Sequence, residues 1–323
     1  MSDRRPDGSL WLVGAGPMAC EYAKVLSAEG HDFEVIGRSE ASAARCEALT
    51  GIPVRRGGLL SALSESGPPE LAVVAVGVDQ LAAVATALVT AGTGRVLVEK
   101  PAGVDSSEIR ALWRVAEQSS AEVLVGYNRR FYASVVAARR LIEEDGGATS
   151  CVFEITEDSK NVAELDLPDA VRASWFLANT SHVVDLVFNL CGEPIELSTQ
   201  TAGSLSWHPS SARFVGSGLT DRGVVFSFHG DWESPGRWGV EVCTRQRRLV
   251  LRPLEQLRMA VRGSEAIEEV DIDNQLDREF KPGLYGLTRA FIMGEDRLLC
   301  HIREQVERCG IYDKIAGYED PLS

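Results

Sequence analysis

The chain has 323 residues, of which 45% are hydrophobic and 25% are charged, so it has the composition of a folded globular protein with room for two domains. Its formal net charge is −14 at pH 7 and its pI is about 4.9. These values exclude nucleic acid and anionic membrane surfaces as main partners, because both polyanions would be repelled, and they leave a small molecule as the expected partner.

The first half of the chain alternates short apolar runs with segments of helical period, which predicts a parallel sheet covered by helices. The expected strands are LWLV (10–13), FEVI (33–36), a weak PVR (53–55), LAVVAV (71–76), RVLVEK (95–100) and EVLVGY (122–127). Gly30, Gly51 and Gly92 stand where helices should stop, and Asp105 with Glu108 predicts a capping box for the next helix.

The pattern changes after Gly147. TSCVFEIT, IELSTQT, RGVVFSFHGDW, WGVEVCT, RLVLRP and IEEVDID alternate apolar with polar residues, which predicts a mostly antiparallel sheet. Helices are expected only at 179–190 and as a pair within 282–309. Residues 147–323 are therefore expected to form an α+β domain that binds substrate and mediates oligomerisation.

The segment GAGPMA, residues 14–19, follows the first expected strand and opens a helix, which is the context of a dinucleotide-binding turn. Gly14 permits the tight turn, Gly16 lets the backbone approach a pyrophosphate, and the helix N-terminus presents free N–H groups to the phosphates. Residues 1–146 are thus expected to be a Rossmann domain. The candidate cofactor contacts are Gly14, Gly16, Pro17, Met18, Arg38, Ser39, Val76, Gly77, Glu99, Lys100 and Asn128.

The end of the second strand, Ile36-Gly37-Arg38-Ser39, favours NADP(H) over NAD(H). NAD sites usually place a carboxylate there to hold the ribose hydroxyls, and Gly37 has none. Arg38 can instead form a charge-assisted pair with a 2′-phosphate, and Ser39 can add a hydroxyl. The alternative is that Arg38 is a solvated loop residue and that Glu40 supplies the missing acid.

Lys100 stands at the end of an apolar strand and is followed by Pro101. Ligands of open parallel sheets bind beyond the carboxyl ends of the strands, so the Lys100 ammonium is expected to meet the reactive end of the cofactor. The alternative is a salt-bridged strand end. A cis peptide bond before Pro101 is compatible with the sequence but cannot be read from it.

The chain resembles the family of glucose-fructose oxidoreductase, inositol dehydrogenase and rhizopine-catabolism proteins, Gfo/Idh/MocA. The resemblance rests on Gly14-Ala15-Gly16, on Glu99-Lys100-Pro101, on residues 126–131 (GYNRRF) and on residues 181–185 (SHVVD). It implies that Lys100 touches substrate and nicotinamide and that His182 works as acid or base. The first-principles chemistry agrees, because removing a hydride from an alcohol requires a group that accepts the hydroxyl proton. For His182 the alternative is a core or capping histidine.

The sequence departs from the family at Ala178, where many members have an aspartate one helical turn before the histidine. Asp185, three residues after His182, is an alternative orienting group, although an aspartate there is more often structural. The candidate substrate contacts are Lys100, Arg129, Asn179, His182, Trp238 and Tyr285. Arg129 and Arg130 can meet a cofactor phosphate or an anionic substrate group, or form a surface cluster.

Trp207, Trp232 and Trp238 suit the apolar face of a sugar ring, but a core or an oligomer interface is the favoured interpretation. A homodimer or homotetramer through the second sheet is expected, because few helices cover that sheet. The seven cysteines form no C-x-x-C pair and predict neither disulfides nor a zinc site, and no metal is expected. No signal core or membrane span is evident, which predicts a cytoplasmic protein.

The sequence therefore predicts a cytoplasmic, NADP(H)-preferring dehydrogenase or reductase that transfers a hydride between nicotinamide and a sugar, nucleotide-sugar or cyclitol carbon. Two alternatives stay open. One is reduction of a C=N or C=C bond in a biosynthetic intermediate. The other is a regulator that senses a dinucleotide without turnover, against which Lys100 and His182 argue and for which Ala178 argues mildly.

Overall fold

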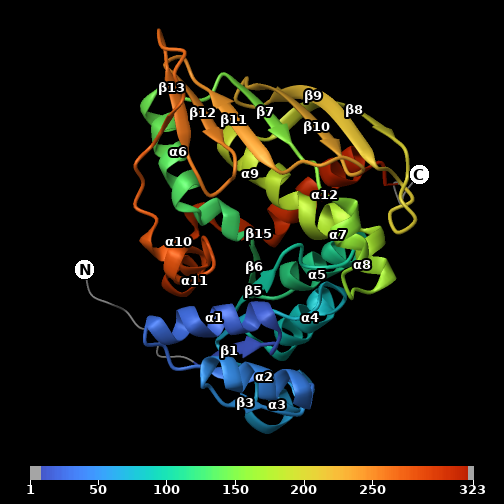
Figure 1. The fold of residues 1–323 in the computed structure, drawn as a ribbon. Coiled ribbons are helices and arrows are strands. Elements are labelled where there is room, and N and C mark those ends of the chain that lie inside the picture. Colours follow the sequence, from blue (N-terminus) through green and yellow to red (C-terminus); the bar gives the residue numbers. More distant parts are fainter. Residues whose placement is uncertain (1–8, 319–323) are drawn as a thin grey trace. The chain divides into compact units, whose positions relative to one another are not determined.

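The computed structural model describes residues 9–318, and these form two compact units (Figure 1). Unit 1 comprises the described residues up to Asn128 together with Arg278–Cys309. Unit 2 comprises Arg129–Asp277 together with the described residues from Gly310. The first strand of the second sheet begins at Ser150, whereas the boundary between the two units falls between Asn128 and Arg129.

Unit 1 contains a seven-stranded sheet in the order β15-β6-β5-β4-β1-β2-β3. Six strands are parallel, and the short β15 pairs antiparallel with β6. The strands are β1 (Leu10–Val13), β2 (Glu34–Ile36), β3 (Val54–Arg55), β4 (Leu71–Val74), β5 (Arg95–Glu99), β6 (Glu122–Gly126) and β15 (Cys300–His301). The central strands are buried on both faces, which explains their continuous apolar sequences.

Helices of unit 1 connect these strands: α1 (Pro17–Ala28), α2 (Glu40–Thr50), α3 (Gly58–Ser66), α4 (Leu81–Ala91), α5 (Ser106–Glu117) and α11 (Leu284–Met293). Short 3₁₀ turns lie at η1 (Val78–Gln80), η2 (Asn128–Phe131) and η4 (Asp296–Leu298). The predicted helix signals are confirmed. Gly51 and Gly92 end α2 and α4 in the left-handed conformation, and the Asp105 side chain accepts hydrogen bonds from the N–H groups of Ser107 and Glu108.

Unit 2 is built on an eight-stranded sheet in the order β14-β13-β12-β11-β7-β10-β9-β8. Every neighbouring pair is antiparallel except β7 with β10. The strands are β7 (Ser150–Glu154), β8 (Pro194–Ala202), β9 (Arg213–Thr220), β10 (Val225–Asp231), β11 (Gly239–Cys243), β12 (Arg247–Leu251), β13 (Arg258–Val261) and β14 (Glu268–Glu269).

Unit 2 also contains α6 (Ala133–Glu144), α7 (Ser159–Ala163), α8 (Asp169–Ala173) and α9 (Ser181–Cys191). The short helix α10 (Gln275–Glu279) lies across the boundary between unit 2 and unit 1. The π-helical turn η3 (Phe176–Thr180) leads into α9, and α12 (Ile302–Ala316) contributes residues to both units. The sequence predicts a helix at 179–190 but not the π-helical turn before it. The expectation of helices only at 179–190 and within 282–309 is wrong, because the short helices α7, α8 and α10 also form.

The two faces of the second sheet differ. One face is packed, because α9 lies on β7 and β11 and the rings of Phe153, Phe188 and Phe226 pack together. The opposite face carries Val152, Val215 and Val225, which are 42%, 48% and 54% exposed. The described part of the chain thus leaves apolar side chains on the face that the sequence analysis assigns to an oligomer contact.

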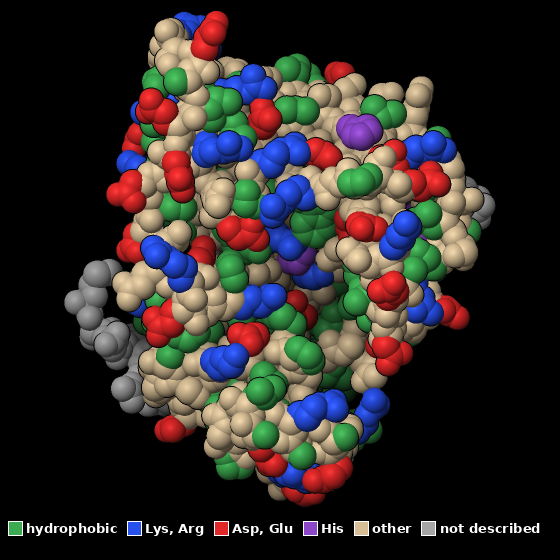
Figure 2. Space-filling view, in the orientation of Figure 1, with side chains coloured by type: hydrophobic (Ala, Val, Ile, Leu, Met, Phe, Trp, Pro, Cys, Tyr) green, Lys and Arg blue, Asp and Glu red, His purple; other side chains and the backbone are tan. Residues whose placement is uncertain are grey.

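The face of the molecule shown in Figure 2 mixes basic, acidic and hydrophobic side chains without a large patch of one sign. Within residues 9–318, no helix has both the length and the apolarity needed to cross a membrane.

Candidate functional site

The glycine turn after β1 has the geometry of a phosphate-binding turn. Gly14 has a φ of 128°, and a Cβ atom there would lie 2.2 Å from the carbonyl oxygen of Ala75, so no other residue fits without rearrangement. Gly16 is the N-cap of α1, Pro17 is its first residue, and no atom lies within 4 Å of where a Gly16 Cβ would stand. A pyrophosphate could therefore approach the backbone at the N-terminus of α1.

The turn after β2 contains the residues expected to choose the cofactor. Gly37 is buried, and a Cβ there would lie 2.6 Å from Cγ1 of Val54. Arg38 and Ser39 are exposed. Glu40, the alternative acid, instead pairs with Arg56 at 2.8 Å between Oε2 and Nε.

The same Arg56 binds Glu47 through both of its Nη atoms, and these hydrogen bonds lower the pKa of Glu47 to about 2. In contrast, no hydrogen bond or ion pair of the Arg38 side chain exists among residues 9–318. A free guanidinium beside an already paired carboxylate favours a phosphate over a bare ribose at this position.

Lys100 follows β5 directly and is half-buried, and the Lys100–Pro101 peptide bond is cis. The neighbouring Glu99 is 9% exposed and accepts a hydrogen bond of 2.7 Å from the hydroxyl of the fully buried Tyr22. Burial raises the pKa of the Glu99 carboxyl, although the Tyr22 hydrogen bond and the charges of Lys100 and Lys281 oppose the rise. Lys100 therefore stands next to a buried acid rather than in a solvated surface pair.

The turn that holds Lys100 is fixed by Gln305, a residue that the sequence analysis missed. The Gln305 amide is fully buried, donates to the carbonyl oxygen of Pro101 at 3.0 Å and accepts from the Tyr127 hydroxyl at 3.0 Å. Asn128, a predicted cofactor contact, donates to the carbonyl oxygen of Pro282 at 2.9 Å. These bonds join the ends of β5 and β6, but their partners lie far away in sequence and carry no motif.

In unit 2, His182 is the second residue of α9 and is 6% exposed. Its ring lies 6.5 Å from the Trp238 ring, centroid to centroid, at an interplanar angle of 56°. Asp185 forms a two-point ion pair with Arg130, at 2.8 Å and 2.5 Å, and both side chains are almost fully buried. The structural alternative for Asp185 therefore accounts for its position, and Arg130 is a core residue rather than part of a surface cluster.

Glu157 is the carboxylate that contacts the turn before His182. It follows β7, and it accepts hydrogen bonds from Trp175 Nε1 at 2.7 Å, from Asn179 Nδ2 at 2.9 Å and from the Thr180 hydroxyl. These donors lie on and just before the π-helical turn η3. No sequence signal identified Glu157, because its partners lie 18 to 23 residues away in the chain.

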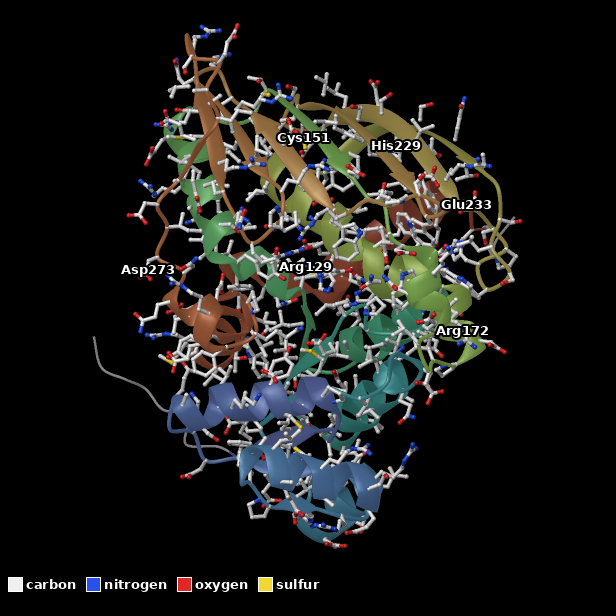
Figure 3. All side chains as sticks on the ribbon, viewed as in Figure 1. Arg129, Cys151, Arg172, His229, Glu233 and Asp273 are labelled. Carbon is white, nitrogen blue, oxygen red and sulfur yellow. The ribbon has the colours of Figure 1, made fainter. Side chains whose placement is uncertain are left out.

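A cavity of about 480 Å³ in unit 2 is lined by Glu157 and by three of the predicted substrate contacts, namely Arg129, Asn179 and Trp238. The Arg129 side chain, labelled in Figure 3, places its guanidinium carbon 4.3 Å from the centroid of the Trp238 ring. An aromatic face beside amide, carboxylate and guanidinium groups suits a polar ring such as a sugar.

The remaining aromatic candidates lie elsewhere. Trp232 is 1% exposed, donates to the carbonyl oxygen of Ile155 at 3.0 Å and stacks on Trp207 with centroids 5.9 Å apart, so both belong to a packed aromatic cluster. Tyr285 is in unit 1, where its ring lies 5.2 Å from that of Phe280. Its role as a substrate contact stays a prediction.

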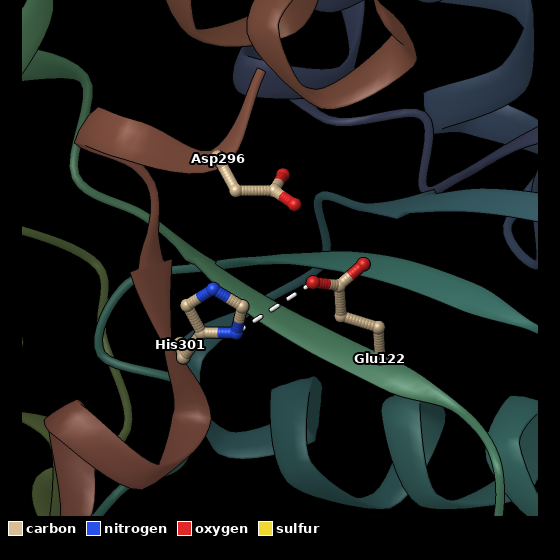
Figure 4. Close-up of side chains that lie close together, drawn as sticks. All are labelled: Glu122, Asp296 and His301. Atoms are coloured by element: carbon tan, nitrogen blue, oxygen red, sulfur yellow. Dashed lines mark ion pairs between the residues drawn. The ribbon is translucent and has the colours of Figure 1, made fainter. Parts of the chain in front are cut away.

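Glu122, Asp296 and His301 of unit 1 bring three potential metal ligands together (Figure 4). His301 Nδ1 lies 3.7 Å from Glu122 Oε1. However, the Arg95 guanidinium pairs with both Glu122 and Asp296, so it already supplies the positive charge that the carboxylates require. We therefore interpret the cluster as an ion-pair network at the edge of the sheet and assign no metal to it.

Comparison with known proteins finds two sequence matches. Residues 10–127 match the model described as "Oxidoreductase family, NAD-binding Rossmann fold". The chain is 27% identical to the inositol 2-dehydrogenase of Rhizobium meliloti (strain 1021) over 195 residues. This match covers 60% of the chain and 58% of the relative, which is less than two thirds of the relative's length.

Three solved structures share the fold over nearly the whole chain. The UDP-N-acetylglucosamine 3-dehydrogenase GnnA of Acidithiobacillus ferrooxidans has a TM-score of 0.75 at 16% identity and covers 96% of this chain and 97% of its own. An oxidoreductase of Agrobacterium radiobacter, in complex with NAD+, L-tartaric acid and magnesium, has a TM-score of 0.77 at 13% identity. The match covers 97% of this chain and 96% of that structure's chain. Levoglucosan dehydrogenase, in complex with NADH and levoglucosan, has a TM-score of 0.75 at 16% identity, and the match covers 96% of each chain.

Proposed function

We propose that the chain is an oxidoreductase of the Gfo/Idh/MocA family, which its sequence matches support, and that it transfers a hydride between a nicotinamide dinucleotide and a CH–OH carbon of a sugar, nucleotide-sugar or cyclitol. Residues 1–146 bind the dinucleotide and residues 147–323 bind the substrate in this proposal. The inositol 2-dehydrogenase relative and the sugar-linked dehydrogenases of the same fold support the substrate class.

The proposed cofactor is NADP(H) rather than NAD(H). The residues fit a dinucleotide, because the space beside Gly16 is open and α1 presents its N-terminus there. Gly37 provides no carboxylate, Glu40 is paired with Arg56, and Arg38 is exposed with a free guanidinium among the described residues. Arg38 and Ser39 bind the 2′-phosphate in this proposal.

Lys100 and His182 move the proton in the proposed reaction. The bound nicotinamide accepts or donates the hydride. When an alcohol is oxidised, its hydroxyl proton must go to a base, and a neutral lysine or histidine can accept it and return it in the reverse direction. Glu99 lies beside Lys100 in the chain, and burial raises the pKa of its carboxyl.

Glu157 takes over the positioning role of the acid missing at Ala178. Ala178 is buried in η3 and has no polar side chain, whereas the Glu157 carboxylate binds Trp175, Asn179 and Thr180 around the same turn. Because the amide nitrogen of Asn179 donates to Glu157, its amide oxygen can accept a hydrogen bond from a substrate hydroxyl. Glu157 thereby sets the turn that presents both Asn179 and His182.

The exposed valines of β7, β9 and β10 support a homodimer or homotetramer through the second sheet. Light scattering tests the assembly, and a monomer at micromolar concentration would remove the oligomer from the proposal.

The seven free cysteines support a reducing compartment, and we propose the cytoplasm.

The free guanidinium of Arg38 beside a neutralised Glu40 and the carboxyl-end position of Lys100 carry the proposal. The test is reduction of NADP+ and of NAD+, followed at 340 nm, with a panel of hexoses, inositols and nucleotide-sugars. We expect turnover with at least one member of the panel and a preference for NADP+. Compounds with C=N or C=C bonds are tested for reduction by NADPH in a parallel assay. If the protein binds NADPH but turns over neither the polyols nor these compounds, the dinucleotide-sensing regulator is favoured instead.

A further inference from the structure

Among the residues that the structure describes, no carboxylate forms an ion pair with Arg129. Its side chain is only partly exposed, and its Nη1 atom is buried without a hydrogen-bond partner. Among residues 9–318, no carboxylate oxygen lies within 4.0 Å of its guanidinium nitrogens. The guanidinium instead lies over the Trp238 ring and beside the Tyr132 hydroxyl. A desolvated charge normally has an opposite charge nearby, because burial without one is costly.

The next residue in sequence, Arg130, has the counter-ion that Arg129 lacks in the described part of the chain. Arg130 has a two-point ion pair with Asp185, as a buried arginine requires. The two arginines are adjacent in sequence and both belong to unit 2, yet only one of them has a protein counter-ion among the described residues. This difference suggests that the counter-ion of Arg129 comes from a ligand.

The acidic residues of the cavity do not supply that counter-ion. Glu157 is held by three donors, and Asp158 accepts a hydrogen bond from the backbone N–H of Lys160 at 3.0 Å. Glu255, the third acid of the lining, is exposed, so water screens its charge. A second arginine of the lining, Arg237, also lacks a carboxylate partner in the described part of the chain.

The indole of Trp238 adds another donor. Among the described residues its buried Nε1 atom has no hydrogen-bond partner, so the cavity wall contains two buried donors, from Arg129 and from Trp238. Arg237, which precedes Trp238 in sequence, adds an exposed guanidinium to the lining. Such a donor-rich wall matches a planar carboxylate or a phosphate better than a hydroxyl, because several oxygens of one group can accept at once. A small shift of either side chain would turn these donors toward a ligand.

We propose that the substrate is a sugar or cyclitol that carries a carboxylate or a phosphate, and that Arg129 binds this anionic group in the cavity. The inference rests on the proposed function and names its substrate class. Asn179 faces the hydroxyl groups of the same ligand, so the cavity distinguishes a charged end from a polyol end.

The experiment uses matched pairs of compounds with the full-length protein and NADP+. D-glucose is compared with D-glucuronate and glucose 6-phosphate, and myo-inositol with myo-inositol 1-phosphate. We expect kcat/KM for an anionic member to exceed that of its neutral counterpart by at least about tenfold, the value of one hydrogen bond to a charged group. The carboxylate and phosphate arms identify which anion the site prefers.

Arg129→Met should reduce this anionic preference by about tenfold or more, because methionine still packs on Trp238 but has no charge. Arg222→Met is the matched control. Arg222 is an exposed arginine of unit 2 outside the cavity lining, so its loss removes the same charge and should leave the ratio unchanged. Calorimetric binding of the same compounds to the NADPH-loaded protein gives a second measurement that needs no turnover.

Three outcomes would overturn the inference. Neutral compounds could be bound and oxidised as well as their anionic counterparts, in which case the dehydrogenase stands and the substrate class is wrong. Arg129→Met could leave the ratio unchanged. It could also weaken NADPH binding about tenfold, which would assign Arg129 to a cofactor phosphate. By contrast, Arg129-dependent binding of an anionic sugar without any reduction of NADP+ would refute the proposed reaction and leave the anion site in place.

Discussion

Unit 1 and unit 2 assemble their candidate sites in different ways. In unit 1, Gly14, Arg38 and Lys100 come after the carboxyl ends of three strands of one parallel sheet, β1, β2 and β5, so short motifs at strand ends mark them. In unit 2, Arg129, Glu157 and Trp238 come from three separate segments and meet around one cavity. The first arrangement follows from local order in the chain, and the second depends on how an antiparallel sheet folds back on itself.

The difference teaches where function can vary. A motif at a strand end is positioned by the sheet itself, so its place depends little on distant segments of the chain. This arrangement suits a cofactor that many related proteins share. A cavity assembled from distant segments can change one wall at a time, which suits substrates that differ among relatives. The predictions below test whether the two units separate the tasks in this way.

The largest effect is expected at Lys100. Lys100→Met keeps the length of the side chain but removes its proton-transfer group, and loss of a general acid or base typically costs about 10² to 10⁴ in rate. We expect kcat to fall by that factor while the melting temperature and the Kd for NADPH remain near those of the parent protein. Steady-state assays give kcat, thermal unfolding gives the melting temperature, and a fluorescence titration gives the Kd for NADPH.

A Lys100→Met protein that loses stability but retains turnover per folded molecule would make Lys100 a structural strand end. His182→Asn gives a comparison within the other unit. A smaller loss than that of Lys100→Met indicates that Lys100 carries most of the proton transfer, and a larger loss indicates that His182 is the main base.

The next effect is expected at Glu157. Glu157→Gln keeps the shape but turns an amide N–H₂ toward donors that need an acceptor, so the turn before His182 should shift. We expect kcat to fall about tenfold to a hundredfold, because misplacement by about 1 Å is enough for such a loss. The amide resonance of Asn179 and the indole N–H of Trp175 report the shift by NMR without any substrate.

Asp158→Asn is the matched control for Glu157→Gln. Asp158 lines the same cavity, and its removal deletes the same charge, but its side chain accepts only from the backbone of α7. If both variants lowered kcat equally and left the Trp175 indole resonance in place, the cavity charge would matter and the positioning role of Glu157 would be wrong.

A third effect concerns cofactor choice. Arg38→Ala should raise the Kd for NADPH about tenfold or more and change the Kd for NADH by less than about twofold, because only NADPH carries the phosphate that Arg38 would bind. Arg45→Ala, on the exposed surface of α2, controls for the loss of one positive charge. Equal affinities of the parent protein for the two cofactors would refute the NADP(H) preference.

The smallest effect is a pH dependence of stability at Glu99. Burial raises the pKa of the folded Glu99 carboxyl above its usual 4.5, so its protonated form stabilises the fold at low pH and that contribution is lost as the pH rises through the folded pKa. Glu99→Gln should therefore gain stability relative to the parent as the pH rises from about 4.5 to 8. We expect the gap in Tm to widen by a few degrees, since about 1 kcal/mol corresponds to roughly 2–4 °C.

A Tm gap between Glu99→Gln and the parent that stays constant with pH would show that Lys100 and Lys281 offset the burial of Glu99 completely. Thermal unfolding followed by circular dichroism in matched buffers gives the two curves. The activity of the variant is not needed for this test.

The sequence predicts most of the fold because its signals are local. The strand LWLV, the Asp105 cap and the change of pattern near Gly147 each depend on neighbours a few residues away. The π-helical turn at Phe176–Thr180 has no such signal, since its geometry accompanies hydrogen bonds to Glu157. Gln305 is likewise invisible in sequence, because it lies 204 residues from the Pro101 carbonyl that it binds.

The candidate site is only partly predictable for the same reason. The pattern identifies Arg129, Asn179 and Trp238 by their residue types and context, and these three do meet around one cavity. It leaves the role of Asp185 open, and the structure adds the buried ion pair that Asp185 forms with Arg130. Which carboxylate stands near the turn before His182 depends on tertiary contacts that no local rule contains.

The close packing at Gly37 limits how the cofactor preference could be changed by evolution or by protein engineering. A side chain at this position would press against Cγ1 of Val54, and a valine has little rotamer freedom with which to move away. A single Gly37→Asp substitution would therefore cost stability before it could hold a ribose. A paired change with Val54→Ala opens the room first, so the path toward NAD(H) requires two substitutions in a fixed order.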